Sequence, residues 1–425
     1  MAPSGGGRIN CHAPHAPFPS ICRAIAAILK RVFLPLLLLF SAAMASALVA
    51  YGTHPAWAQY SHGLGLILFA RRFEWPLVAL AVLLCLTLVA LVVAGKRRAW
   101  WLIGLGPVLA LFVHRYETDP LRGFAIVDGP GFVSAQQAAF MAEKDYVVGL
   151  HFEGTAYAYP YHAMYSSPVV FQFDHDKRMV LMWSAFANRA VAYHITHDLY
   201  ARDLEIVSMP ANALLLYNSK LGQFINGLTG SMPSGRKPTG FTRMIPVEKM
   251  TWRDWVASHP ATLVMVPRST PKGGKTPNAP LLPWFGLPPP KDGRPIATPI
   301  VLIAATQPVA VLAAAVPPAL ANVSAGGLPM LLFPDPATKR ARVYDRRLED
   351  LTLRFAVNTD ARRKQAALID RETNSGWSVD LRAIDGPLGR SGKRLTPVPI
   401  EEGLYWGVMK RWMPELELTE LRPVR

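Results

Sequence analysis

Two stretches of the chain follow the same order of motifs. Residues 214–266 contain LLLYNSKLGQFINGLTG, then the basic turn GRKPTGFTRMIP, and then VEKMTWRDWVASHPATLVM. Residues 367–418 contain ALIDRETNSGWSVDLRAIDG, the basic turn GRSGKRLTPVPI, and then EEGLYWGVMKRWMPELEL. The offset between the copies is 154 residues at Trp252/Trp406. An internal repeat of this length predicts two similar modules in tandem.

Short apolar runs separated by turn residues precede each of these stretches. Asp145–Tyr159 alternates on both sides of Glu153-Gly154, which predicts a β-hairpin with a tight turn. Pro299–Ala310 has the same form in the second copy. Further short strands are predicted over 169–173, 179–183, 190–195, 204–207, 214–217, 330–333, 341–345 and 351–357.

Each module is expected to close with a short amphipathic helix. Trp252, Trp255 and Val256 fall at i, i+3 and i+4, so one helix face is apolar, and Pro260 ends the helix. The second copy repeats this spacing with Tyr405, Val408, Met409 and Trp412 before Pro414. The predicted fold class is therefore α+β and rich in β-strands. Two to three N-terminal transmembrane helices precede the two similar modules.

The distribution of charge indicates a membrane protein. Residues 1–116 hold ten Lys and Arg against one acidic residue, Glu74, so +9 of the net charge of +16 lies there. Basic residues at the ends of membrane spans explain this surplus, and we expect no nucleic-acid partner. No cysteine follows residue 116, which excludes disulfides, CxxC redox chemistry, zinc ribbons and a cysteine nucleophile from the remainder of the chain.

Residues 32–51 and 75–95 are apolar runs of 20 and 21 residues, long enough to cross a bilayer as helices. Residues 99–113 form a shorter candidate for a third span. Proline is dense after the first module, which predicts an extended linker. The predicted organisation is a cytoplasmic tail over 1–29, a transmembrane anchor over 30–116, a first module over 117–266, a proline-rich linker over 267–298 and a second module over 299–425.

Basic residues around the spans predict the orientation. With three spans and the N-terminus inside, seven Lys and Arg lie on the cytoplasmic side and three on the outer side. The sequence thus predicts a protein of the bacterial inner membrane with a cytoplasmic N-terminus. Both modules are then extracytoplasmic, in the periplasm.

Several of these stretches carry a family resemblance. The segments DGPGFVSAQQAAFM, VVGLHFEGTAYAYP, LLYNSKLGQFINGLTG and LIDRETNSGWSVDLRAIDGPL are similar to domain of unknown function 3179, a family of bacterial exported proteins that is itself internally repeated. The resemblance extends over about residues 119–420. It implies the fold and export of this chain, and no established activity.

The chain departs from the family pattern at two places. The family has a W-H-E segment and a C-P-x-C-G segment in its first module, where this chain reads AMYSSPVVF (163–171) and MWSAFANRA (182–190). Ser166-Ser167 stand at the His-Glu pair, and residues such as Ser184 and Ala187 stand at the cysteines. The chain therefore lacks the reactive groups that the family has there.

One cluster of side chains allows a metal hypothesis. Five of the eleven histidines fall within 47 residues. Among them, His194 and His197 with Asp198 could bind a divalent metal such as copper or zinc. If 190–197 is a strand, however, the two imidazoles point to opposite faces. Ordinary structural histidines explain the pattern as well.

Other motifs favour structure over catalysis. Neither a G-x-S-x-G nucleophile context nor a phosphate-binding P-loop occurs. Asp370-Arg371-Glu372 predicts a local ion network at a hairpin turn that ends in Asn374-Ser375-Gly376.

We therefore expect no catalytic residue and no cofactor. The predicted function is a membrane-anchored extracytoplasmic binding or assembly module, with an anionic envelope ligand or a protein as partner. The two repeated basic turns and a groove between the modules are the candidate binding surfaces. The alternative is a metal-dependent, hydrolase-like periplasmic enzyme that uses the His/Asp cluster of the first module. The sequence leaves the ligand and the oligomeric state open.

Overall fold

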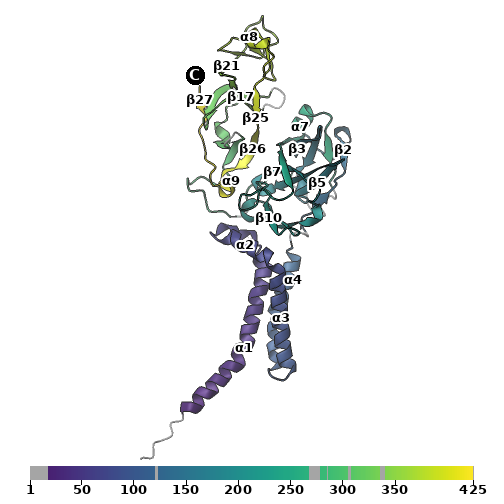
Figure 1. The fold of residues 1–425 in the computed structure, drawn as a ribbon, viewed down its shortest axis with the longest axis vertical. Coiled ribbons are helices and arrows are strands. Elements are labelled where there is room, and N and C mark those ends of the chain that lie inside the picture. Colours follow the sequence, from purple (N-terminus) through teal and green to yellow (C-terminus); the bar gives the residue numbers. More distant parts are fainter. Residues whose placement is uncertain are drawn as a thin grey trace, which may run out of the picture. The chain divides into compact units, whose positions relative to one another are not determined.

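The computed structural model describes residues 18–119, 123–267, 278–284, 286–304, 308–335 and 340–424, with side chains from residue 32 onward. The chain divides into two compact units (Figure 1). A helical unit comprises Met1–Gly52 and Ala70–Thr118, and a larger unit, here called the body, comprises Thr53–Phe69 and Asp119–Arg425.

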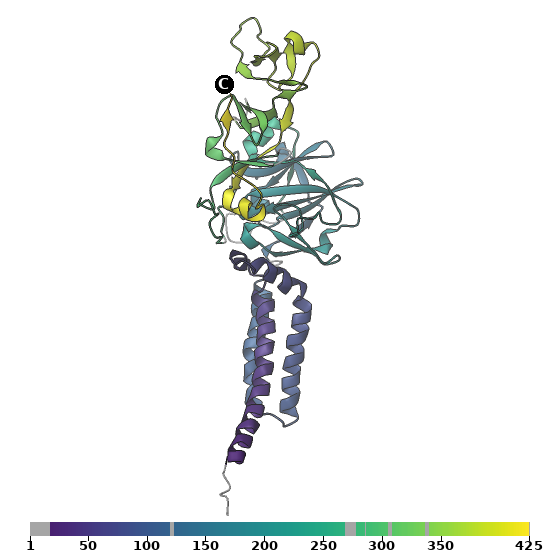
Figure 2. The ribbon, with the colours of Figure 1, turned by 60° about the vertical axis from the view of Figure 1, so that its left-hand side comes forward.

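The helical unit consists of three main helices that run side by side (Figure 2). They are α1 (Phe18–Tyr51), α3 (Glu74–Val93) and α4 (Leu105–Glu117), the last preceded by the 3-10 helix η2 (Ala99–Gly104). Within α1 and α3, Val32–Tyr51 and Glu74–Val93 are long and apolar enough to cross a membrane. These two segments agree with the apolar runs predicted over 32–51 and 75–95.

The first module contains three sheets and two short helices. The sheet orders are β1-β5-β6-β7-β11, β12-β3-β4-β13-β2 and β10-β9-β8. The strands are β1 Ile126–Asp128, β2 Phe132–Ser134, β3 Tyr146–Phe152, β4 Thr155–Pro160, β5 Val169–Asp174, β6 Lys177–Ser184, β7 Arg189–Ile195, β8 Leu204–Ser208, β9 Leu215–Asn218, β10 Gln223–Asn226, β11 Phe241–Ile245, β12 Val247–Thr251 and β13 Leu263–Met265. The helices are α6 Tyr161–Met164 and α7 Trp252–Ser258.

The β5–β6–β7 sheet is the middle layer of this module. One of its faces packs on the β3–β4 sheet and the other on β8–β10, and α7 covers the far face of the β3–β4 sheet. Residues 179–183 of β6 (MVLMW) are all fully buried, since a strand covered on both faces has no solvent side. The continuous apolar run in the sequence reflects this position.

The second module contains four sheets and two short helices. The sheet orders are β15-β14-β26, β25-β18-β17-β16-β27, β21-β22-β23-β24 and the ribbon β19-β20. The strands are β14 Pro299–Ile303, β15 Val309–Leu312, β16 Ala321–Ala325, β17 Leu328–Pro334, β18 Ala341–Asp345, β19 Arg347–Leu348, β20 Leu351–Thr352, β21 Phe355–Val357, β22 Leu368–Asp370, β23 Gly376–Trp377, β24 Ala383–Asp385, β25 Thr396–Val398, β26 Ile400–Tyr405 and β27 Arg422–Pro423. The helices are α8 Gly386–Gly389 and α9 Trp406–Trp412.

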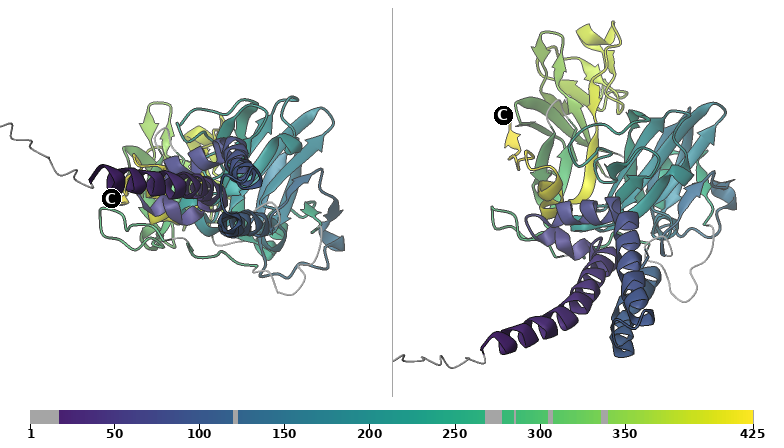
Figure 3. Two further views of the ribbon diagram at one scale, coloured as in Figure 1. Left: turned by 90° about the horizontal axis from the view of Figure 1, so that it is seen from below. Right: turned by 60° about the horizontal axis from the view of Figure 1, so that its bottom comes forward.

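The order of strands in the second module follows that of the first. Figure 3 shows the strands of both modules from two further directions, teal in the first and green to yellow in the second. The run β12-β3-β4 corresponds to β26-β14-β15, β5-β6-β7-β11 corresponds to β16-β17-β18-β25, and β8-β9-β10 corresponds to β21-β22-β23. The layers correspond too, because α9 covers the β14 sheet, which packs on the β17 sheet, which packs on the β22 sheet. The predicted fold class, α+β and rich in β-strands, is confirmed.

The two closing helices begin in the same way. The backbone N–H of Trp252 donates to the carbonyl of Asp145 (2.6 Å), and that of Trp406 donates to the carbonyl of Thr298 (2.9 Å). Helix α7 ends before Pro260 and α9 before Pro414, as their apolar spacing predicts. One prediction needs refinement: residues 351–357 form two short strands, β20 and β21, rather than one.

Candidate functional site

Two of the three predicted metal ligands, His194 and His197, line a groove of the first module. His194 is on β7, Arg243 is on β11, and Glu153 is in the turn of the β3–β4 hairpin. These three line both a hollow of about 600 Å³ and an adjoining one of about 360 Å³. We call the two hollows together the Arg243 groove, which is also lined by His151, Gly154, Asp176, Lys177, Arg178, Ile195, His197, Thr242, Met244, Ile245 and Pro246.

The tight hairpin predicted from the sequence forms one wall of the groove. Phe152 pairs with Thr155, so only Glu153 and Gly154 connect the strands. Both turn residues have positive φ, 47° and 82°, as a two-residue turn with the twist of a hairpin requires. The turn therefore presents the Glu153 carboxylate next to β7.

His194 is held in one protonation state by its neighbours. Its Nε2 lies 3.3 Å from a guanidinium nitrogen of Arg243, and its Nδ1 lies 3.9 Å from a carboxylate oxygen of Glu153. Because a guanidinium only donates, Nε2 acts as the acceptor and Nδ1 carries the proton. Burial, Arg243 and Lys177 lower the pKa of His194, while Glu153 raises it. The imidazole is therefore neutral at pH 7.

The three predicted metal ligands differ in their exposure to solvent. His197 and Asp198 are exposed beyond the end of β7, whereas His194 is half-buried and its Nε2 already faces Arg243. Across the residues that the structure describes, no group of three or more His, Cys, Asp or Glu is placed to hold a metal ion. The metal site stays a prediction of the sequence.

A second cluster of charges joins the two modules. Arg189 of β7 makes a two-pronged hydrogen bond with Glu401 of β26, with distances of 2.8 and 3.3 Å. Arg340 binds Glu402 of β26 and donates to the carbonyl of Lys249 on β12 at 2.7 Å. Arg189 and Arg340 are 151 residues apart and hold equivalent places in the two copies. Each thus makes a contact that crosses between the modules.

Asn188 completes this cluster from a left-handed backbone position, φ 47°. Its side-chain oxygen accepts from the Tyr161 hydroxyl (2.7 Å), and its side-chain nitrogen donates to the carbonyl of Gly403 (2.9 Å). Gly403 has φ 70°, and a Cβ there would lie 2.9 Å from that same nitrogen, so glycine suits both the backbone and the contact. Lys249 and Gly403 are equivalent residues on the outermost strands β12 and β26. Each therefore has its edge carbonyl bonded by a side chain of the other module.

The ionisation of Lys249 is strongly altered by this setting. Its side chain is 8% exposed, and its ammonium donates to the carbonyl of Asn188. Burial, the largest cause, acts with Arg189 and Arg340 to lower the pKa of Lys249 to about 7, against the opposing effects of Glu401 and Glu402. Burial opposes ionisation of Glu401, but Arg189 outweighs it and lowers the pKa of that carboxyl.

A cleft of about 500 Å³ opens beside this cluster, between β12 on one side and β18, β25 and β26 on the other. Lys249, Arg340, Glu401 and Glu402 are among the residues that line it. It is the intermodule groove that the repeat led us to expect, and it combines charged side chains with the apolar edges of four strands.

Small side chains fill the positions at which the sequence resemblance implies His-Glu and cysteine groups. Ser184 is fully buried and its hydroxyl accepts the backbone N–H of Leu214 at 3.0 Å, while Ala187 is fully buried as well. The Ser166 hydroxyl donates to the carbonyl of Ala163 at 3.1 Å. These side chains have structural contacts in the first module. The sequence analysis named these positions but missed two residues. Asn188 lies within the segment 182–190, and Lys249 contacts Asn188.

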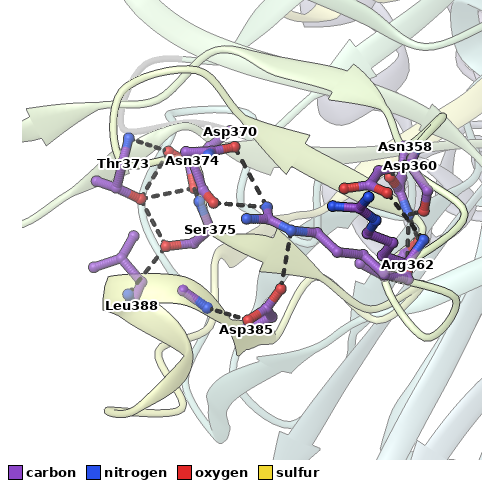
Figure 4. A network of polar contacts seen from close by, with 12 residues as sticks. Asn358, Asp360, Arg362, Asp370, Thr373, Asn374, Ser375, Asp385 and Leu388 are labelled. Carbon is purple, nitrogen blue, oxygen red and sulfur yellow. Dashed lines mark hydrogen bonds and ion pairs between the residues drawn. The ribbon is translucent and has the colours of Figure 1, made fainter.

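The loop of the motif LIDRETNSGW is held by neutral donors around one carboxylate (Figure 4). The fully buried Asp370 accepts from the backbone N–H of Thr373 (2.6 Å) and of Ser375 (3.1 Å), and from the indole of Trp377 (2.8 Å). The predicted ion network is different in detail, because Glu372 pairs with Arg354 at 2.7 Å rather than with its sequence neighbours. Asp370 therefore shapes the turn, which is the structural role expected of it.

Among the comparisons with known proteins, one segment of the chain matches a protein family. Residues 123–280 match the family described as "Protein of unknown function (DUF3179)". This segment is similar to that family. The match covers the first module and part of the linker, and is shorter than the resemblance over about 119–420 that the motifs suggest. The second module, with LIDRETNSGW, lies outside it. No curated protein and no solved structure matches the chain.

Proposed function

We propose that the protein is a membrane-anchored, extracytoplasmic binding module without catalysis of its own. The observation that carries this proposal is the composition of the core of the body. Ala58 of the 3-10 helix η1 (Pro55–Gln59) and Ile67 of α2 (Gly63–Arg72) lie in the connection 53–69 between α1 and α3, here called the loop segment. Both pack in one cluster with Ala211, Leu287 and Val408. Arg411 of α9 also donates to the carbonyl of Ala58 at 3.2 Å. The loop segment is therefore part of the body.

A shared core requires a shared compartment. If α1 and α3 both cross the membrane, the loop segment lies on one side, and the chain leaves α3 on the other side. Residues 119–425 can return to the side of the loop segment only through a third crossing. The segment η2–α4, with 6 and 13 residues, is the one available. At about 2.0 and 1.5 Å per residue it spans roughly 31 Å, close to the thickness of a bilayer core.

The orientation rests on the basic residues already counted. Seven of them lie on the side of the N-terminus in a three-span arrangement, against three on the other, which favours a cytoplasmic N-terminus and an external body. The proposed location is the inner membrane of a bacterial cell, with the body in the periplasm.

A labelling experiment tests this topology in intact spheroplasts of an expressing strain. Single cysteines are introduced as Ser61→Cys, Lys96→Cys and Ser391→Cys, all exposed positions. The starting variant has alanine at Cys11, Cys22 and Cys85. A membrane-impermeant maleimide should label positions 61 and 391 at once, and position 96 only after the cells are opened. Opposite labelling of 61 and 391 overturns the shared compartment.

Binding is proposed because the body offers two built grooves. The modules are joined by buried contacts, so the cleft beside Lys249 is preformed, and the Arg243 groove lies in the first module. The partner we propose is an anionic envelope ligand, on the basis of the repeated basic turns. The matching strand orders also support the proposal that the modules are two copies of one repeat.

A further inference from the structure

We propose that the Arg243 groove binds an anionic ligand through a phosphoryl group, held by Arg243 and approached from the rim by Lys177 and Arg178. This inference rests on the proposed function and gives it a site and a ligand class. The basic turn around Arg236 and Lys237 continues the same surface, because Lys237 donates to the carbonyl of Thr242, next to Arg243.

Arg243 is the principal evidence. Its side chain is exposed and lines both hollows of the groove. Among the residues that the structure describes, its side chain has one hydrogen-bond contact, with the neutral His194, and no carboxylate lies within ion-pair distance of it. A guanidinium beside a neutral acceptor in a groove retains most of its donors for a ligand.

The two rim cations are available as well. Lys177 is 3.5 Å from Asp176 in an exposed pair, which is worth little in water. Arg178 donates to the carbonyl of His197 at 3.2 Å and lies over the rings of Phe173 and Tyr200, 5.2 Å from each centre. These contacts orient its guanidinium without neutralising it.

The arrangement favours a phosphoryl group over a carboxylate. Arg243 lies on β11, and Lys177 and Arg178 lie at the start of β6, so three cations from two strands line the same hollow. A phosphoryl group offers three oxygens in three directions, whereas a carboxylate offers two in one plane. Arginine also matches phosphate with two parallel hydrogen bonds.

The basic turn of the second module has cations with similar contacts. In its basic turn, Lys393 pairs with Glu349 at 2.5 Å and Arg394 donates to the carbonyl of Asp380 at 3.3 Å. Arg243 has no basic counterpart on β25, because Thr396 and Pro397 stand at the equivalent places, so the first copy is the one suited to a ligand.

His194 links this site to pH. It is faced by Arg243 from β11, by Glu153 from the hairpin turn, by Lys177 from the β5–β6 turn and by the ring of Phe152 from β3. An anion bound to Arg243 weakens the repulsion that keeps His194 neutral, so the imidazole takes up a proton more readily. Binding should therefore tighten as the pH falls toward 5.5.

The test uses the full-length protein in a maltoside detergent and isothermal titration at low salt. The probes are inorganic tripolyphosphate and dihexanoyl phosphatidylglycerol, with dihexanoyl phosphatidylcholine as the neutral comparison. Binding of the first points to a soluble polyanion, and binding of the second to a lipid headgroup. Arg243→Gln should weaken binding of the anionic probe about tenfold or more, which corresponds to about 1.4 kcal/mol.

Two further variants make the result decisive. Arg253→Gln removes an equally positive charge at a side chain that is 68% exposed and paired with Asp254, and it should leave affinity unchanged. His194→Gln should abolish the difference between pH 5.5 and pH 7.5. Equal weakening by Arg253→Gln, or wild-type affinity in Arg243→Gln, overturns this site while leaving the anchored topology to its own labelling test. Failure of the wild type to bind either anionic probe overturns the ligand class.

Discussion

Lys249 holds an amine inside a cluster whose charges balance only when that amine is neutral. Arg189 and Arg340 oppose Glu401 and Glu402, two charges of each sign, so a protonated Lys249 is one cation too many. A buried lysine without a carboxylate of its own releases its proton readily. The junction of the modules is therefore sensitive to pH at a single residue.

This sensitivity has a definite sign. The pKa of Lys249 is about 7 in the folded protein and near its ordinary value of 10.5 when unfolded. Between these values the unfolded chain binds more protons, so the free energy of unfolding should rise with pH, by at most about 1.4 kcal/mol per pH unit. Denaturant unfolding of the full-length protein at pH 7, 8 and 9 measures this. Lys249→Met should flatten the slope and the exposed Lys393→Met should not, and a slope unaffected by Lys249→Met contradicts the assignment.

Glu401 gives a second prediction. Glu401→Gln leaves the guanidinium of Arg189, which is 8% exposed, without its carboxylate. Breaking one side of a buried ion pair costs about 3–5 kcal/mol. Glu349→Gln breaks an exposed pair, in which the Glu349 side chain is 64% exposed, and should cost less than about 1 kcal/mol. Denaturant unfolding measures both losses of stability. Equal losses would show that the buried Arg189–Glu401 pair stabilises the protein no more than the exposed pair does.

At the level of elements, the two modules fill one contact with different side chains. In the first module Trp255 of α7 packs flat on the sheet at Gly149 of β3, where a Cβ would lie 2.3 Å from the indole. The equivalent residues in the second module are Met409 of α9 and Leu302 of β14, both buried. A large residue over glycine and two medium residues occupy similar volume, so the helix can cover the sheet in both copies.

This contact predicts a large effect from one methyl group. Gly149→Ala should destabilise the body by about 1–3 kcal/mol, because the Trp255 ring has no room to move within the core. Gly131→Ala serves as the control, since a Cβ there meets nothing within 4 Å. Thermal unfolding of both variants provides the comparison. Equal midpoints would mean that the helix shifts freely on the sheet.

The sequence predicts single helices and strands better than it predicts the contacts between residues that are far apart in the chain. Alternation around Glu153-Gly154 and the spacing of Trp252 and Trp255 are local patterns, and the structure has the hairpin and the helix where they indicate. The carboxylate that binds Arg189 is 212 residues away, and no local pattern relates them. The same holds for His194 and Arg243, 49 residues apart, whose contact follows from the pairing of β7 with β11. The sequence therefore identified single residues of the candidate site, but it could not predict that they line one groove.

At the scale of the whole molecule, the body depends on the loop segment that connects the apolar helices α1 and α3 in the sequence. Ile67 is fully buried in the cluster where both modules and Leu287 of the linker meet. Ile67→Ala should therefore lower the stability of the body by about 2–5 kcal/mol. Leu282→Ala, at a side chain that is 67% exposed, is the control. Tryptophan fluorescence during denaturant unfolding reports the change, and an unaltered midpoint for Ile67→Ala would remove the loop segment from the core.

The hydrogen bonds at the edge strands can form only after both modules have been synthesised. The carbonyl of Lys249 receives its hydrogen bond from Arg340, 91 residues later in the chain. A ribosome that adds roughly 5–20 residues per second reaches Arg340 about 5 to 18 s after Lys249. During that interval the edge of β12 is open to strands of neighbouring nascent chains, the usual start of aggregation. Once the second module has been synthesised, Arg340 can bond the edge of β12, and the first module is then less prone to aggregate.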